Sequence, residues 1–176
     1  MGFEGCELLT DPNRTVDFEH FMDQAKTMLE TEFPDEDLRP NDLVIALNRA
    51  AGIAIRSAEG QVHRPKGLSW NAFKMLFILW IRGDMEQHRV SQLGGMSRAT
   101  TSAVVKVLVR LDYLIQTQSE ADKRTNVLAL TDAGSDIAQE IFLEQNELLR
   151  SWSDRLTHTE QDMLKMLLGK LMRGRD

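Results

Sequence analysis

The feature of this chain that most constrains its fold is a short helix followed by a glycine turn and a second, capped helix. Residues 86–93 have the pattern of a short helix, which Gly94 and Gly95 end because glycine readily adopts the left-handed conformation that closes a helix. Ser97 then offers a side-chain acceptor to the free backbone N–H groups at the start of the next helix. This order predicts a helix-turn-helix motif.

The elements on either side of this motif extend it to a larger domain. The helix predicted before it, residues 70–82, is apolar almost all round, which is typical of a core helix. After it, residues 114–119 and 125–130 are rich in β-branched and apolar residues and flank a charged turn, which predicts a β-hairpin. A helix-turn-helix followed by such a hairpin is typical of a winged helix-turn-helix domain, in which the hairpin is the wing.

The rest of the chain is predicted to be helical. Apolar residues recur at helical spacing over residues 15–33, in a helix that begins at Asn41, and in two helices after residue 131. The fold class is therefore mainly α with a small β-hairpin wing. The predicted segments are an acidic extension with one amphipathic helix, a helical region in two parts, and the winged helix-turn-helix domain: residues 1–40, 41–69 with 132–176, and 70–131.

The charge of the chain is unevenly distributed around a net value of −6. Residues 1–42 contain twelve acidic and three basic residues, whereas residues 85–125 contain six basic and four acidic residues. A local excess of positive charge is typical of a surface that binds phosphate groups. The acidity therefore belongs mainly to the N-terminal extension, and it does not exclude a nucleic-acid partner for the predicted domain.

The second helix of the motif and the hairpin turn carry side chains suited to DNA. Short or flexible donors at the start of the helix can reach base edges or phosphates in the major groove, and Lys106 farther along suits a phosphate. In the turn, Arg124 suits the minor groove, Asp122 can orient it by an ion pair, and Lys123 suits a phosphate. The candidate DNA-binding residues are Ser97, Arg98, Thr100, Thr101, Ser102, Lys106, Asp122, Lys123 and Arg124.

Three blocks of sequence mark the start of the second helix, the hairpin turn and the start of the long helix after it: Gly95-Met96-Ser97-Arg98-Ala99-Thr100, Asp122-Lys123-Arg124 and Leu130-Thr131-Asp132-Ala133-Gly134. With their spacing, these blocks resemble the multiple-antibiotic-resistance regulator (MarR) family of winged-helix transcriptional regulators over about residues 43–172. The resemblance implies an obligate homodimer on pseudo-palindromic double-stranded DNA. It also implies that the helical region of residues 41–69 and 132–176 forms the dimer interface.

The resemblance further implies a small aromatic or anionic effector, bound between the dimerisation helices and the DNA-binding domain. Arg56, His63 and Trp70 are the candidate effector-binding residues, although the favoured interpretation of Trp70 is a core residue. The apolar face over residues 18–29 is interpreted as extra dimer surface, with a capping helix as the alternative.

The sequence departs from the family pattern at three positions. In the family, glycine usually follows the second helix of the motif, which is called the recognition helix. Asp112 stands at that position here, and aspartate tolerates a left-handed conformation better than most residues. Gln116 and Ala103 stand where basic residues are common in the family. Both departures lower the expected number of phosphate contacts.

Other classes of function fit the sequence poorly. An enzyme is not expected, because the chain has no phosphate-binding glycine loop and no nucleophile with a matching base. No metal or cofactor is expected, because the four histidines lack a metal-binding spacing and Cys6 is the single cysteine. An acidic N-terminus and the lack of an apolar run of ~18 residues predict a cytoplasmic protein without a membrane span. The remaining alternative is a winged-helix module that binds proteins without sequence-specific DNA binding.

Overall fold

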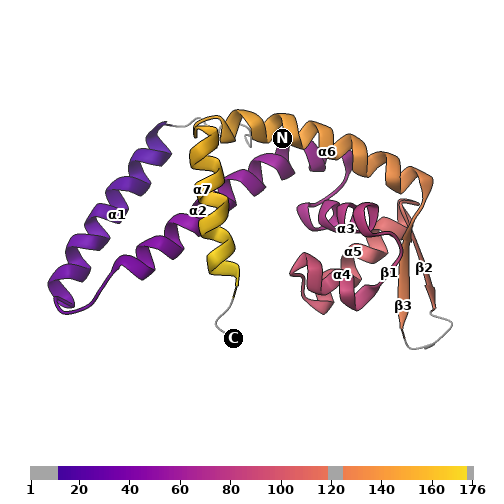
Figure 1. Ribbon diagram of the computed structural model, residues 1–176, viewed down its shortest axis with the longest axis horizontal. Helices are drawn as coiled ribbons and strands as arrows, with labels where there is room; N and C mark the ends of the chain where they lie inside the picture. Colours follow the sequence, from indigo (N-terminus) through magenta and orange to yellow (C-terminus); the bar gives the residue numbers. More distant parts are fainter. Residues whose placement is uncertain (1–11, 119–124, 174–176) are drawn as a thin grey trace, which may run out of the picture. The chain divides into compact units, whose positions relative to one another are not determined.

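The computed structural model describes residues 12–118 and 125–173, with side chains described from Phe18 onward (Figure 1). The chain divides into two compact units, Met1–Lys66 and Gly67–Asp176. It is mainly helical with one small antiparallel sheet, which confirms the predicted fold class. No helix in the described part of the chain combines the length and the apolar character needed to cross a membrane.

The first unit consists of two long helices and two short helical turns, α1 (Pro12–Glu32), α2 (Arg39–Ala58), η2 (Glu59–His63) and η3 (Arg64–Lys66). α2 begins two residues before the predicted start at Asn41, because Pro40 fits the first helical turn, where no backbone N–H is needed. Helical structure continues through η2, a π-helical turn, and η3, a 3-10 turn, as far as Lys66.

The second unit contains the predicted domain and the C-terminal helices. Its elements are α3 (Trp70–Arg82), β1 (Met85–Glu86), α4 (Gln87–Gly94), α5 (Arg98–Arg110), β2 (Leu114–Gln118), β3 (Asn126–Leu130), α6 (Asp132–Ser153) and α7 (His158–Met172). The predicted cap of α5, Ser97, is present, and α3, α6 and α7 begin at caps of the same kind. The hydroxyls of Ser69, Ser97 and Thr131 each accept a backbone N–H three residues later, and Thr157 forms a reciprocal capping box with Glu160.

The wing belongs to a three-stranded sheet in the order β1-β3-β2 (Figure 1). β2 and β3 form the predicted hairpin, with Leu114 opposite Leu130 and Gln118 opposite Asn126. The sequence did not predict β1, whose two residues are too few to show a strand periodicity. Met85 pairs with Leu128, so β1 joins the start of α4 to the sheet.

The core of the second unit forms around α3, which contacts α4, α5, α6 and β3. Phe77 of α3 stacks on Phe142 of α6 with ring centroids 5.9 Å apart, and Trp80 lies at the same distance from Phe142. The prediction of a core helix at α3 is confirmed by its buried side chains, and Ile81 at its C-terminal end is 59% exposed. The largest fully buried side chains of this unit are Met75, Leu76, Leu79, Leu108, Leu114, Leu128 and Ile141.

The turn after α5 packs directly against the start of α6. Asp112 has φ +58°, which confirms the expected left-handed conformation. Its carbonyl accepts a hydrogen bond of 2.6 Å from the Thr131 hydroxyl, and the same hydroxyl caps α6. Gly134 is buried so close to Tyr113 that an added Cβ would overlap the Tyr113 carbonyl. This contact explains why the third sequence block has glycine there.

Candidate nucleic-acid interface

The helix predicted to read DNA, α5, has two chemically different faces. Arg98, Ser102, Lys106 and Arg110 are exposed and follow one another at a spacing of four residues, so they share one side of the helix. On the opposite side, Val104, Val105 and Leu108 are buried in the domain. α5 is therefore anchored by one face and presents a basic and hydroxyl-bearing face to solvent.

The first turn of α5 combines a side-chain cap at Ser97 with backbone N–H groups that the cap does not use. The Ser97 hydroxyl accepts the Thr100 backbone N–H at 3.1 Å and lies 2.8 Å from the Thr100 hydroxyl. The cap leaves other N–H groups of the first turn pointing outward at the positive end of the helix dipole. With Arg98 exposed beside it, this turn suits a phosphate.

One of the predicted DNA-binding residues is not available to a ligand. Thr101 is 1% exposed, and its hydroxyl donates to the Ser97 carbonyl at 2.9 Å. A threonine hydroxyl that returns to the carbonyl four residues earlier satisfies itself within the helix. The prediction of a DNA contact for Thr101 was therefore wrong, and its methyl group packs in the core.

The predicted turn between α4 and α5 is a Schellman motif. Gly95 adopts φ +59° and donates to the Gln92 carbonyl at 3.2 Å, while Met96 donates to the Ser91 carbonyl at 3.0 Å. Gly94 before it is buried. The glycine pair thus ends α4 as predicted and redirects the chain into α5 within three residues.

The wing is tied to the helix-turn-helix by a contact that sequence reasoning missed. The Gln116 side-chain amide of β2 donates to the Gln87 side chain at the start of α4, at 3.1 Å. Gln116 was interpreted only as a lost phosphate contact, because no local pattern links residues 29 positions apart. The predicted DNA-binding residues of the wing, Asp122, Lys123 and Arg124, lie outside the described residues, so their roles stay predictions.

The basic residues of the domain differ in how strongly they are engaged. Arg89 at the start of α4 forms an ion pair of 3.1 Å with Glu86, so part of its charge is neutralised. The side chains of Arg98, Lys106 and Arg110 form no hydrogen bond or ion pair with any residue in the described part of the chain. These three cations of α5 are therefore available to phosphates.

The three candidate effector residues differ in exposure. Arg56 is exposed in α2, His63 is fully buried in η2, and Trp70 is half-buried at the start of α3. Arg56 and His63 belong to the first unit and Trp70 to the second, so their joint role in one site stays a prediction.

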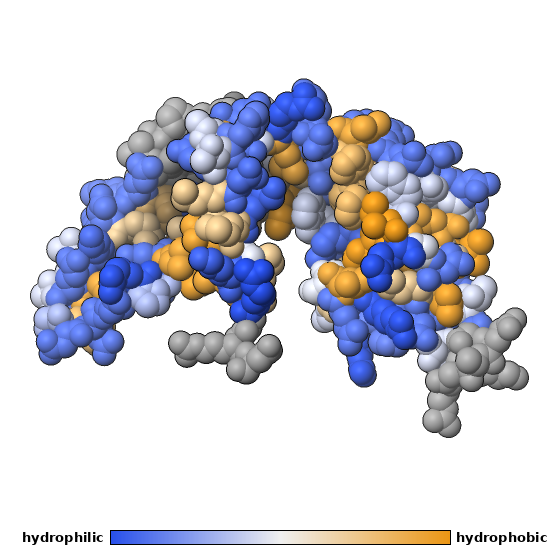
Figure 2. Space-filling view, viewed as in Figure 1, coloured by the Kyte–Doolittle hydropathy of each residue, from blue (hydrophilic) through white to orange (hydrophobic). Residues whose placement is uncertain are grey.

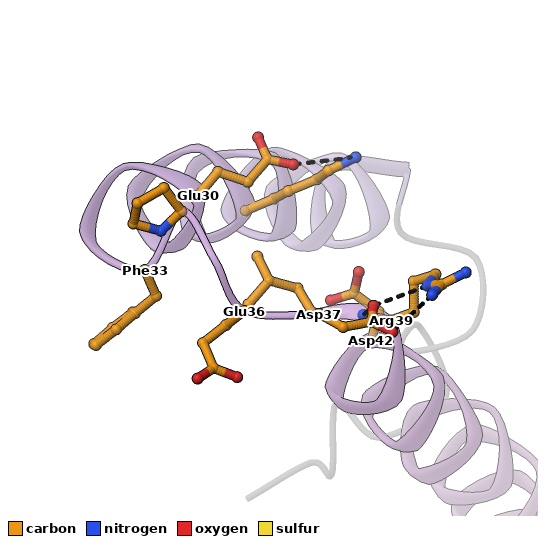
Figure 3. Close-up of a pocket in the computed structure, with 9 residues that line it drawn as sticks. Glu30, Phe33, Glu36, Asp37, Arg39 and Asp42 are labelled. Carbon is orange, nitrogen blue, oxygen red and sulfur yellow. Dashed lines mark hydrogen bonds and ion pairs between the residues drawn. The ribbon is translucent and has the colours of Figure 1, made fainter.

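A hollow of about 410 Å³ lies in the first unit, between the end of α1 and the start of α2 (Figure 3). Its lining includes Asp37 and Arg39, whose side chains form two hydrogen bonds of 2.8 Å. The side-chain hydrogen bond from Arg39 lowers the pKa of Asp37, and the same bond raises the pKa of Arg39. No predicted site residue lines this hollow. Across residues 12–118 and 125–173, no three histidine, cysteine or carboxylate side chains gather as metal ligands.

Comparison with known proteins places these features in a family. A sequence model of the MarR family matches residues 66–125. The helix-turn-helix transcriptional regulator YwaE of Bacillus subtilis is 30% identical over 142 residues, covering 80% of this chain and 83% of that protein. The transcriptional regulator MgrA of Staphylococcus aureus is 25% identical over 142 residues, covering 81% of this chain and 95% of that protein.

Solved structures share the fold at lower sequence identity. A MarR mutant from Escherichia coli, in complex with operator DNA, superposes with a TM-score of 0.68 at 17% identity and covers 81% of this chain and 96% of its own. BpsR of Bordetella bronchiseptica superposes with a TM-score of 0.69 at 21% identity. The match covers 74% of this chain and 98% of the BpsR chain. The matched proteins are transcriptional regulators and not enzymes. The chain belongs to the MarR family of winged helix-turn-helix transcriptional regulators.

Proposed function

We propose that the protein binds pseudo-palindromic operator DNA as a homodimer, with α5 of each protomer in the major groove. The observation that carries this proposal is the exposed face of α5, where Arg98, Lys106 and Arg110 are free of other partners in the described chain while the opposite face is buried. In this arrangement Arg98 and Ser102 lie nearest the base edges, and Lys106 and Arg110 bind phosphates. The MarR mutant solved with operator DNA supports this role.

The homodimer is supported by the C-terminal helices. No side chain of α7 is buried among the described residues, although much of the helix is apolar. The space-filling view shows apolar side chains at the surface among hydrophilic ones (Figure 2). A second copy of the chain is the partner we propose for this surface, because such exposure is typical of an oligomer interface. The exposed apolar residues of α7 are Met163, Leu164, Met166, Leu167, Leu171 and Met172.

A small aromatic or anionic effector is the regulatory part of the proposal. Two structural neighbours support it: BpsR, whose DNA binding is regulated by 6-hydroxynicotinic acid, and PcaV of Streptomyces coelicolor, solved with its natural ligand. Arg56, His63 and Trp70 remain the candidate residues for such a ligand. Operator DNA as the target places the protein in the cytoplasm.

The test is selection of bound DNA from a random duplex library at two salt concentrations. Wild type is expected to enrich a pseudo-palindrome whose half-sites are about one helical turn apart, ~34 to 36 Å. Arg98→Ala is expected to weaken enrichment and relax the preference at one base position of each half-site. Lys165→Ala removes a positive charge from α7, away from α5, and is the matched control. Arg124→Ala tests the wing in the same way.

Each outcome of the selection decides between two functions. A pseudo-palindrome that depends on Arg98, with affinity that falls steeply as salt rises, supports DNA recognition, because steep salt dependence reports counterion release from phosphates. If wild type enriches no sequence motif at either salt concentration, the proposal is contradicted. That result would favour the alternative, a winged-helix module that binds another protein.

A further inference from the structure

The end of α4 contains a buried carbonyl that the Schellman motif does not satisfy. The motif pairs the carbonyls of Ser91 and Gln92 with backbone N–H groups of the turn. Gly94 is buried, so its carbonyl needs a donor from elsewhere in the domain. Lys74 of α3 supplies it, because its Nζ donates to the Gly94 carbonyl at 2.5 Å from 20 residues away.

The position of Lys74 makes this hydrogen bond strong. The ammonium group lies at the C-terminal end of α4, where the helix dipole favours a positive charge. The lysine is half-buried, and its neighbours Met75 and Leu76 are fully buried in the core, so the backbone that carries it is fixed. A charged donor in partly desolvated surroundings forms a stronger bond than a neutral one.

A second side chain ties the other end of the turn. The Ser91 hydroxyl donates to the Met96 carbonyl at 2.7 Å, directly before the Ser97 cap of α5. Lys74 therefore joins the end of α4 to the core helix α3, while Ser91 joins α4 to the residue that leads into α5. We call this pair of contacts, Lys74 to Gly94 and Ser91 to Met96, the turn clamp.

We propose that Lys74 is a positioning residue for DNA recognition, which holds the turn clamp and thereby sets the angle at which α5 presents Arg98 and Lys106. The inference rests on the proposed function, since the orientation of α5 matters only if α5 reads DNA. The inference requires Lys74 to act through the Gly94 carbonyl and not through a phosphate, so its removal should leave the number of DNA charge contacts unchanged.

The first test needs no DNA. In Lys74→Met, which keeps the apolar stem and removes the donor, amide hydrogen exchange of Gly95 and Met96 is expected to be about tenfold faster than in wild type. Exchange of the core residue Ile141 is expected to be unchanged. Lys165→Met, the same substitution at an exposed lysine, is expected to leave all of these amides unchanged. Equal exchange at Gly95 and Met96 in Lys74→Met and wild type would overturn the inference.

The second test measures affinity for the selected operator against salt concentration. Lys74→Met is expected to lower affinity about tenfold without changing the slope of log affinity against log salt, because no phosphate contact is lost. Lys106→Met is the matched contrast. It is expected to reduce that slope by about two per dimer, one phosphate contact from each protomer. A reduced slope in Lys74→Met would overturn the inference, because it would make Lys74 a direct phosphate contact.

Two further variants keep the inference testable. If Lys74→Met does not fold, Ser91→Ala removes the other half of the turn clamp, and a normal operator affinity in that variant would count against the clamp. Lys74→Arg keeps the charge and the donor and is expected to recover most of the lost affinity; no recovery contradicts the inference. If wild type enriches no duplex, the proposed function fails by itself, and hydrogen exchange alone decides whether Lys74 holds the turn.

Discussion

At the scale of single residues, the junction between Asp112 and Gly134 explains two of the less usual choices in this sequence. Asp112 holds a left-handed conformation at which glycine carries no steric cost. Its carbonyl is fixed by Thr131, so the turn and the cap of α6 depend on each other. Gly134 lies against the same turn, where the Tyr113 carbonyl leaves no room for a Cβ. The presence of a side chain at either position therefore affects the stability of the fold, through backbone strain at residue 112 and through a steric overlap at residue 134.

Asp112→Gly is expected to raise the free energy of unfolding by about 1 kcal/mol, because glycine removes the strain of a left-handed conformation. Urea unfolding followed by circular dichroism measures the change. Asp112→Ala is the control at the same position, since alanine keeps the strain and loses aspartate's tolerance of this conformation. A gain in stability with alanine as large as that with glycine would contradict the explanation.

Gly134→Ala is expected to lower the free energy of unfolding by about 2 kcal/mol, because the new methyl group forces the Tyr113 carbonyl and the start of α6 apart. Gly169→Ala in α7 is the matched control, because among the described residues an added Cβ there meets nothing within 4 Å beyond the backbone of its own helix. There the same substitution is expected to stabilise by up to about 1 kcal/mol, since alanine favours the helix. Thermal unfolding of both variants checks the opposite signs, and equal signs would refute the steric explanation.

At the scale of the elements, four helices of the second unit, α3, α5, α6 and α7, each begin at a capping side chain that can be read in the sequence. The capping box of α7 is the clearest case, because Glu160 accepts hydrogen bonds from both the hydroxyl and the backbone N–H of Thr157 at 2.8 Å. The side-chain bond from Thr157, and then the backbone bond, lower the pKa of the Glu160 carboxyl. The ionised carboxylate is therefore the form that stabilises the start of α7.

The lowered pKa of Glu160 predicts a pH dependence with a definite sign. A carboxyl whose pKa is lower in the folded state stabilises the fold above its unfolded pKa, and this stabilisation is lost as pH falls through the folded pKa. Carbon NMR titration of the Glu160 carboxyl is expected to give a midpoint below that of an ordinary glutamate. In Thr157→Ala the midpoint is expected to move towards that of an ordinary glutamate, because the hydroxyl bond is lost while the backbone bond remains. An unshifted midpoint in wild type would contradict the capping box.

At the scale of the whole molecule, the exposed apolar face of α7 determines the oligomeric state we expect. Leu164, Leu167 and Leu171 recur at helical spacing and are 40%, 46% and 57% exposed. A stripe of this kind is unfavourable in water and becomes favourable when a second copy covers it. Two DNA-binding domains held at a fixed distance then match two half-sites of a pseudo-palindrome.

Leu167→Glu is expected to convert a dimer into a monomer, because a carboxylate at the centre of an apolar interface loses its hydration without a partner. Sedimentation velocity at micromolar concentration measures the change, and operator affinity is expected to fall with it. Lys165→Glu, on the same helix at an exposed position, is expected to remain a dimer. Wild type that sediments as a monomer would refute the proposed homodimer.

The sequence alone was sufficient for several features whose physical cause is local. Helix ends follow from glycine and capping hydroxyls within a few residues, so the start of α5 at Ser97 and the end of α4 at Gly95 were predicted correctly. The left-handed conformation of Asp112 was expected from the family resemblance, in which glycine stands at this position, and aspartate tolerates it. The polar face of α5 follows from helical spacing, which is a property of one segment.

Only the tertiary structure revealed the contacts between segments far apart in the chain. Periodicity placed Thr101 on α5, but its burial depends on how α5 packs against the domain, and this excludes it from the DNA-binding face. The strand β1 exists only because β3 offers it a partner. In the sequence, Lys74 is a single charged residue in a predicted core helix. The fold brings it to the Gly94 carbonyl, 20 residues away. Such pairings depend on the packing of whole elements, for which no local pattern carries a signal.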